Sequence, residues 1–139
     1  MTGLPEITLA GVLVADPELC VTRTGTVVTN FTVVTNDRGI DPTTGKWVDR
    51  APTLLPCSIR RQAAENVAES LTQGVRVLVT GVLRQREWGT TGGVKRYGYE
   101  VDATEVGVSL RSATVKITQT TWDATSGSAT RWDDDKPPR

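Results

Sequence analysis

The sequence contains no histidine, and this absence excludes whole classes of site. Catalytic triads with an imidazole base and zinc sites with histidine ligands cannot be built. Only two cysteines are present, Cys20 and Cys57, which are too few for a structural zinc site. We expect both to be reduced thiols that pack as small apolar groups, and a disulfide between the Cys20 residues of two subunits is the less favoured alternative.

Long apolar runs are also missing. No run approaches the roughly 18 apolar residues needed to cross a bilayer. The N-terminal residues Met1–Glu6 lack the basic segment and apolar stretch of a signal peptide. These absences predict a cytoplasmic protein without a membrane partner. At 139 residues the chain has the length of one domain with its own core.

The formal net charge is zero, but the charges are unevenly spread along the chain. The segment from Arg50 to Arg96 holds eight basic and three acidic residues, a net charge of +5. The C-terminal end instead carries the run Asp133–Asp135. The neutral total therefore combines a basic middle, which suits a nucleic-acid partner, with an acidic C-terminal end.

Most of the chain has the composition of β-strands. The segment Asn36–Lys46 is rich in Asp, Gly and Pro and is predicted to be an exposed loop. Pro56 indicates an edge or a bulge in the strand around it. Apolar, β-prone runs predict five strands, at Ile7–Val14, Val27–Thr35, Leu54–Ile59, Val75–Trp88 and Lys95–Val106.

One helix interrupts the strands. Ala64, Val67, Ala68 and Leu71 form an apolar stripe at helical spacing, and Gly74 follows as a predicted stop. Three strands, one helix and two strands is the order of the five-stranded oligonucleotide-binding barrel. We therefore predict an all-β fold of this kind over residues 1–118, with one helix between strands 3 and 4 and a β-hairpin extension. Because apolar periodicity fades after Val115, residues 119–139 are predicted to be a flexible, mildly acidic tail.

The predicted hairpin holds the most informative pattern. Side chains alternate along a strand, so Arg84, Arg86 and Trp88 are expected on one side. Two guanidinium groups can contact phosphates while the indole stacks on a base, as sequence-tolerant binding of single strands requires. The alternative is an ordinary solvated strand end whose tryptophan fills a gap.

Further candidates lie beside this pattern. Tyr97 and Tyr99 share a face, and core packing suits them at least as well as base stacking. Trp47 ends a polar loop, where it either folds onto the barrel as a lid or stacks on a base. The remaining basic candidates are Lys95 and Arg96 at the hairpin tip, Arg60 and Arg61 where the third strand meets the helix, and Arg38 in the loop.

Two further patterns resemble motifs of other chemistry, but neither matches its motif. Gly39–Lys46 resembles a phosphate-binding loop, but its glycines are one residue too far apart and Trp47 replaces the magnesium-binding hydroxyl. Glu100, Asp102 and Glu105 could suggest a metal-dependent nuclease, but no lysine or histidine accompanies them in a recognisable pattern. We therefore predict no catalytic residue, no metal site and no cofactor.

A series of ordered blocks spans residues 6–116. The blocks are Ile7–Gly11, Ala15–Leu19, Asn30–Val33, Ala64–Leu71, Gly81–Arg86 and Glu105–Thr114. Together they resemble the bacterial single-stranded DNA-binding protein family, and its actinobacterial branch in particular. The resemblance implies a nucleoid-associated homotetramer that wraps single-stranded DNA during replication, recombination and repair. It places Trp88, Arg84, Arg86 and Arg96 on the DNA path.

The sequence also departs from this family. Arg60 stands where the family often has an aromatic residue, and its guanidinium could partly replace the lost stacking. Family members that recruit replication enzymes usually end in phenylalanine, whereas this chain ends in Arg139. Recruitment through the tail is therefore in doubt, and we infer a secondary paralogue.

Two other classes of function stay open at this stage. The same barrel could bind oligosaccharide or another protein, in which case binding would persist at high salt. A nuclease would instead cleave with divalent metal and stop with chelator. Binding dominated by phosphate contacts should weaken with salt, with a log–log slope near −0.7 per phosphate.

Overall fold

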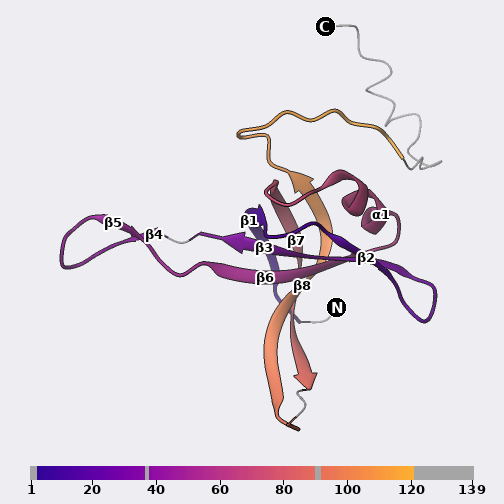
Figure 1. Cartoon of the computed structure of the whole chain (residues 1–139), viewed down its shortest axis with the longest axis horizontal. Coiled ribbons are helices and arrows are strands. Elements are labelled where there is room, and N and C mark those ends of the chain that lie inside the picture. Colours follow the sequence, from indigo (N-terminus) through magenta and orange to yellow (C-terminus); the bar gives the residue numbers. More distant parts are fainter. Residues whose placement is uncertain (1–2, 37, 90–91, 121–139) are drawn as a thin grey trace, which may run out of the picture.

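A computed structural model describes residues 3–36, 38–89 and 92–120 (Figure 1). Strands dominate it, and the short helix lies between the third and fourth strands of the predicted barrel. The elements are β1 (Glu6–Leu13), β2 (Glu18–Val21), β3 (Val27–Thr35), β4 (Arg38–Ile40), β5 (Trp47–Asp49), β6 (Thr53–Arg60), α1 (Arg61–Ser70), β7 (Arg76–Gly89) and β8 (Lys95–Val108).

Five of the strands close into a ring. The main sheet has the order β1-β7-β8-β6-β3-β2, and a further pairing of β1 with β3 joins its two sides. This closing contact runs through Val12 opposite Val34 and Leu13 opposite Val33. β6 and β8 pair in parallel, whereas the other neighbours are antiparallel. The ring confirms the predicted oligonucleotide-binding barrel, and β2 adds to β3 outside it.

The barrel interior is filled mainly by branched aliphatic side chains. Leu13, Val33, Val77, Val79 and Val101 are at most 1% exposed. They come from four different strands of the ring, so the core fixes the strands relative to one another. Side chains alternate along a strand, and the residues between these positions therefore face outward.

Helix α1 closes one end of the barrel. Ala64, Val67 and Leu71 are buried against the core, which confirms the predicted apolar stripe. The Thr29 hydroxyl donates a buried hydrogen bond of 2.6 Å to the Ala64 carbonyl oxygen. The helix ends at Ser70, and Gly74 lies beyond it with φ of 90°. Gly74 therefore shapes the turn into β7, and its predicted role as a direct helix stop is wrong.

The prediction of a loop over Asn36–Lys46 needs correction. β4 lies inside that segment and pairs with β5, forming a small hairpin that projects from the barrel (Figure 1). Ile40 faces Trp47 across it, and Gly45 turns the chain with φ of 70°. Such short strands carry no periodic signal, and turn-forming residues dominated the composition of the segment.

β7 and β8 continue past the barrel as a long antiparallel arm, the predicted hairpin extension (Figure 1). β8 ends at Val108, and the following residues up to 120 have no regular structure. Thr120 donates a hydrogen bond of 2.9 Å to the Asn66 side chain of α1. The predicted tail lies outside the described residues from 121 onward. Within residues 3–36, 38–89 and 92–120, no helix is long and apolar enough to cross a membrane.

Candidate nucleic-acid interface

One face of the β7–β8 arm gathers arginines. In the strand register, Arg84 lies opposite Glu100, and position 88 lies opposite Arg96. Residues directly opposite in an antiparallel pair project on the same side of the sheet. Arg84, Arg86 and Arg96 therefore share one face of the arm.

The other face of the arm carries tyrosines. Glu87 pairs in register with Tyr97, and Tyr99 lies two residues further along β8. Tyr97 is 60% and Tyr99 is 56% exposed, so the suggestion that they pack in the core is wrong. Lys95 is on this face as well, where its Nζ lies 3.4 Å from the Glu87 carboxylate. Lys95 therefore lies on the face of the arm opposite to Arg84, Arg86 and Arg96.

The backbone of Trp88 is part of β7 and lies opposite Arg96 in the strand register. Its side chain lies outside the described part of the structure. The stacking role of Trp88 therefore stays a prediction.

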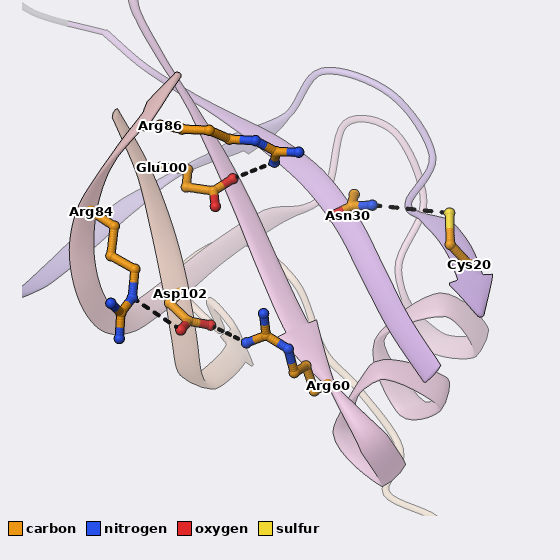
Figure 2. A network of polar contacts seen from close by, with 7 residues as sticks. All are labelled: Cys20, Asn30, Arg60, Arg84, Arg86, Glu100 and Asp102. Atoms are coloured by element: carbon orange, nitrogen blue, oxygen red, sulfur yellow. Dashed lines mark hydrogen bonds and ion pairs between the residues drawn. The ribbon is translucent and has the colours of Figure 1, made fainter. Parts of the chain in front are cut away.

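An ion-pair network links the arm to the end of β6 (Figure 2). Asp102 on β8 accepts from Arg60 Nη1 at 2.7 Å and from Arg84 Nε at 3.3 Å. Arg86 Nη1 donates to Glu100 at 2.8 Å. Three of the predicted DNA-binding arginines thus meet on one side of the barrel, although they come from two strands far apart in sequence.

Arg60 and Arg86 border two adjoining hollows on the outside of the barrel, of about 360 and 300 Å³. Arg84 lines neither hollow and is joined to Arg60 through Asp102. Asn30, Arg86 and Glu100 line both of them, so the hollows form one groove, which we call the arginine groove. Asn30 also donates a weak contact of 4.0 Å to the Cys20 sulfur at the rim. The groove crosses β2, β3, β6, β7 and β8, and its other lining residues include Asp16, Glu18, Val28, Phe31, Ser58 and Arg60.

The two remaining arginine candidates lie elsewhere. Arg61 follows Arg60 at the start of α1 and is exposed, with a left-handed φ of 66°. Arg38 lies on the β4–β5 hairpin, where its Nε is 3.1 Å from the Asp49 carboxylate. Arg38 therefore belongs to a second projecting hairpin and not to the arginine groove.

Trp47 is exposed on that second hairpin. It is 61% exposed and faces Ile40, which is 55% exposed, so it does not fold onto the barrel as a lid. An open indole face on a projecting hairpin suits base stacking, which remains a prediction for this residue.

The two cysteines differ in environment. Cys20 is exposed and Cys57 is buried, and both are free thiols. Burial, with a smaller contribution from the Glu100 carboxylate, raises the pKa of the Cys57 thiol to about 12. Cys57 therefore stays protonated and packs in the core as predicted, whereas the predicted burial of Cys20 is wrong.

Sequence reasoning found the arginines but missed their partners. Glu100 and Asp102 were considered only as metal ligands, yet both bind arginine side chains. Within the part of the chain that the structure describes, no three acidic or cysteine side chains gather as metal ligands. Glu100 and Asp102 alternate along one strand, and this spacing was the signal in the sequence. It indicates pairing with arginines only once the register of β7 and β8 is known.

Comparison with known proteins shows which family this chain resembles. The sequence model of the Single-strand binding protein family matches residues 4–109. Single-stranded DNA-binding protein 2 of Streptomyces coelicolor is 52% identical over 120 residues, covering 86% of this chain and 60% of that protein. The single-stranded DNA-binding protein of Mycobacterium tuberculosis is 48% identical over 131 residues, covering 94% of this chain and 80% of that protein.

Solved structures show the same fold. The small single-stranded DNA-binding protein from Streptomyces coelicolor superposes with a TM-score of 0.66 at 25% identity, covering 78% of this chain and 97% of that one. A Plasmodium falciparum SSB in complex with ssDNA gives a TM-score of 0.68 at 21% identity, again covering 78% of this chain and 97% of that one. With the matches to actinobacterial relatives, these findings confirm the resemblance, and the chain belongs to the Single-strand binding protein family.

Proposed function

We propose that this protein binds single-stranded DNA without sequence preference. The proposal rests on Arg60 and Arg86, which line the arginine groove, and on Arg84, which is joined to Arg60 through Asp102. Guanidinium groups suit phosphate because they present several donors in one plane. The names of the relatives, single-stranded DNA-binding proteins, support the same ligand.

Base stacking supplies the second part of the proposal. Trp88 on the β7–β8 arm and Trp47 on the β4–β5 hairpin are the proposed platforms, since stacking is worth roughly 1–3 kcal/mol per base. Arg96 shares the arginine face of the arm and extends the phosphate path toward its tip. Arg38, Arg61 and Lys95 lie outside the groove and are proposed to make peripheral contacts.

We further propose that the protein wraps DNA as a homotetramer during replication, recombination or repair, at the nucleoid in the cytoplasm. An exposed apolar site supports self-association. Leu78 is 46% exposed on the outer face of β7, with Ala10 of β1 on one side and Gly107 of β8 on the other. The small neighbours leave the leucine side chain prominent, and we propose that it is part of the contact between subunits.

Family membership also confirms that the protein is not an enzyme. The proposed activity needs no chemical step, because binding and release of a strand require only exchange of contacts.

Titration with poly-dT, followed by tryptophan fluorescence at several salt concentrations, tests the proposal. We expect strong quenching and an affinity that falls steeply with salt. Trp88→Ala should weaken binding by about 5- to 150-fold, equivalent to roughly 1–3 kcal/mol, whereas Trp88→Phe should retain most of it.

Absence of both quenching and salt dependence would contradict the proposal and leave a barrel with another ligand. Unchanged affinity in Trp88→Ala would remove only the stacking role of that residue.

A further inference from the structure

The arginine groove carries its own anions. Asp102 contacts both Arg60 and Arg84, and Glu100 contacts Arg86. The carboxylate side chains are 26% and 20% exposed, whereas the three guanidinium side chains are 43–53% exposed. The two acids are therefore more buried than the arginines that they bind, and the arginines lie closer to solvent.

We infer that Glu100 and Asp102 compete with DNA phosphates for these arginines and so limit how tightly the groove holds a strand. The inference rests on the proposed function and adds two residues that set its strength. The evidence for it is the set of ion pairs that Glu100 and Asp102 make with Arg60, Arg84 and Arg86.

The charges support competition. Three guanidinium groups and two carboxylates leave the cluster with a net charge of +1, although it presents three cations to a polyanion. Glu100 also lines both hollows of the groove, so its carboxylate faces the space where a strand would pass. Each phosphate that enters therefore meets a fixed negative charge beside its cation.

The ion pairs can be exchanged for phosphate. Each of the three contacts uses a single guanidinium nitrogen, so other N–H groups of the same arginine remain for a phosphate oxygen. Ion pairs of this exposure contribute little to stability, so binding can reorient them at small cost. The carboxylate nevertheless repels the arriving phosphate and takes up a cation when its arginine leaves.

Neutral variants of the acids should therefore bind single strands more tightly. At low salt we expect Glu100→Gln and Asp102→Asn each to raise affinity about threefold, the effect of one unit charge roughly 6 Å from a phosphate in water. The double variant should gain about tenfold if the effects add. The salt slope should also steepen, by at most about 0.7 per arginine freed, because fewer cations are taken up on binding.

The control is Glu105→Gln, which changes the total charge equally and lies on the same strand. Glu105 is exposed and makes no ion pair in the described chain. Affinities of full-length variants for oligo-dT, measured at several salt concentrations with thermal unfolding as a folding check, test the inference. A gain for Glu100→Gln and Asp102→Asn that clearly exceeds that of Glu105→Gln supports it.

Unchanged or weaker binding of the two neutral variants would overturn it, because the acids would then only orient the arginines. An equal gain for Glu105→Gln would also overturn it, since overall charge would explain the result. Failure of the wild-type protein to bind oligo-dT would instead overturn the proposed function itself. The wild-type titration therefore separates the two failures.

Discussion

Arg61 joins the third barrel strand to the helix in an unusual backbone conformation. Among the described residues it is the one non-glycine with positive φ, at 66°. Its neighbour Arg60 lines the arginine groove and binds Asp102, so the turn after Arg60 affects where the Arg60 side chain lies. A left-handed conformation costs an L-residue about 1–2 kcal/mol, because the β-carbon crowds the following carbonyl oxygen.

Replacing Arg61 with glycine should therefore stabilise the fold. We expect Arg61→Gly to raise the free energy of unfolding by about 1 kcal/mol, since glycine adopts positive φ without the β-carbon penalty but loses some entropy. Urea unfolding at equilibrium measures the change. Arg61→Ala is the matched control, because it removes the same charge but keeps the β-carbon. Equal stability of the two variants would contradict a strained turn.

Residue identity alone predicted the cations but not their pairing. Arg60, Arg84 and Arg86 were recognisable from sequence position, and the structure brings them together. Arg84 and Arg86 reach their acidic partners by diagonal contacts across β7 and β8, which exist only in one register. Arg60 reaches Asp102 from β6, which pairs with β8 on its other side. The burial of Cys57 and the exposure of Cys20 likewise follow from the packing of β6 and the outer position of β2.

At the scale of elements, Gly81 determines how β7 and β8 pass from the barrel into the arm. The strand register shifts between Thr80 and Gly81, which marks a β-bulge. A β-carbon at position 81 would lie 2.3 Å from the Asp102 carbonyl oxygen and 2.7 Å from the Ala103 α-carbon. Both are backbone atoms, so the strands would have to move apart.

Gly81→Ala should consequently destabilise the protein, by about 2 kcal/mol or more, as overpacking of a tight site does. It should also disturb the ion pairs of Asp102 with Arg60 and Arg84, because Asp102 is the residue that the added β-carbon displaces. Gly89→Ala is the control on the same strand, where a β-carbon would meet nothing within 4 Å. Thermal unfolding of both variants measures the difference, and equal midpoints would contradict the close approach.

Long elements were predictable from the sequence and short ones were not. The strand Val27–Thr35 was predicted with its observed bounds, and the helical stripe was correct. β2, β4 and β5 are three or four residues long, and their pairing partners stabilise them more than their own composition does. Pro56 was correctly placed at an edge, since β6 meets β8 only from Cys57 onward.

At the scale of the whole molecule, the proposed homotetramer is testable on the outer face of β1 and β7. Leu78→Asp should weaken self-association at least tenfold, because a buried unpaired carboxylate is costly. Analytical ultracentrifugation over a range of protein concentrations measures the shift toward smaller species. Leu19→Asp makes the same change on β2, which lies outside the closed ring, and should leave assembly intact. An unchanged oligomeric state in Leu78→Asp would exclude this face as an interface.

The sequence by itself determined the barrel, the helix and the basic character of the binding region, because periodicity and charge are local properties. Only the tertiary structure decided which charges meet. Closure of five strands brings the end of β6 beside β8, and the register of β8 then places two carboxylates under three arginines. Contacts between residues tens of positions apart depend on how strands pair, and that is settled by packing of the whole barrel.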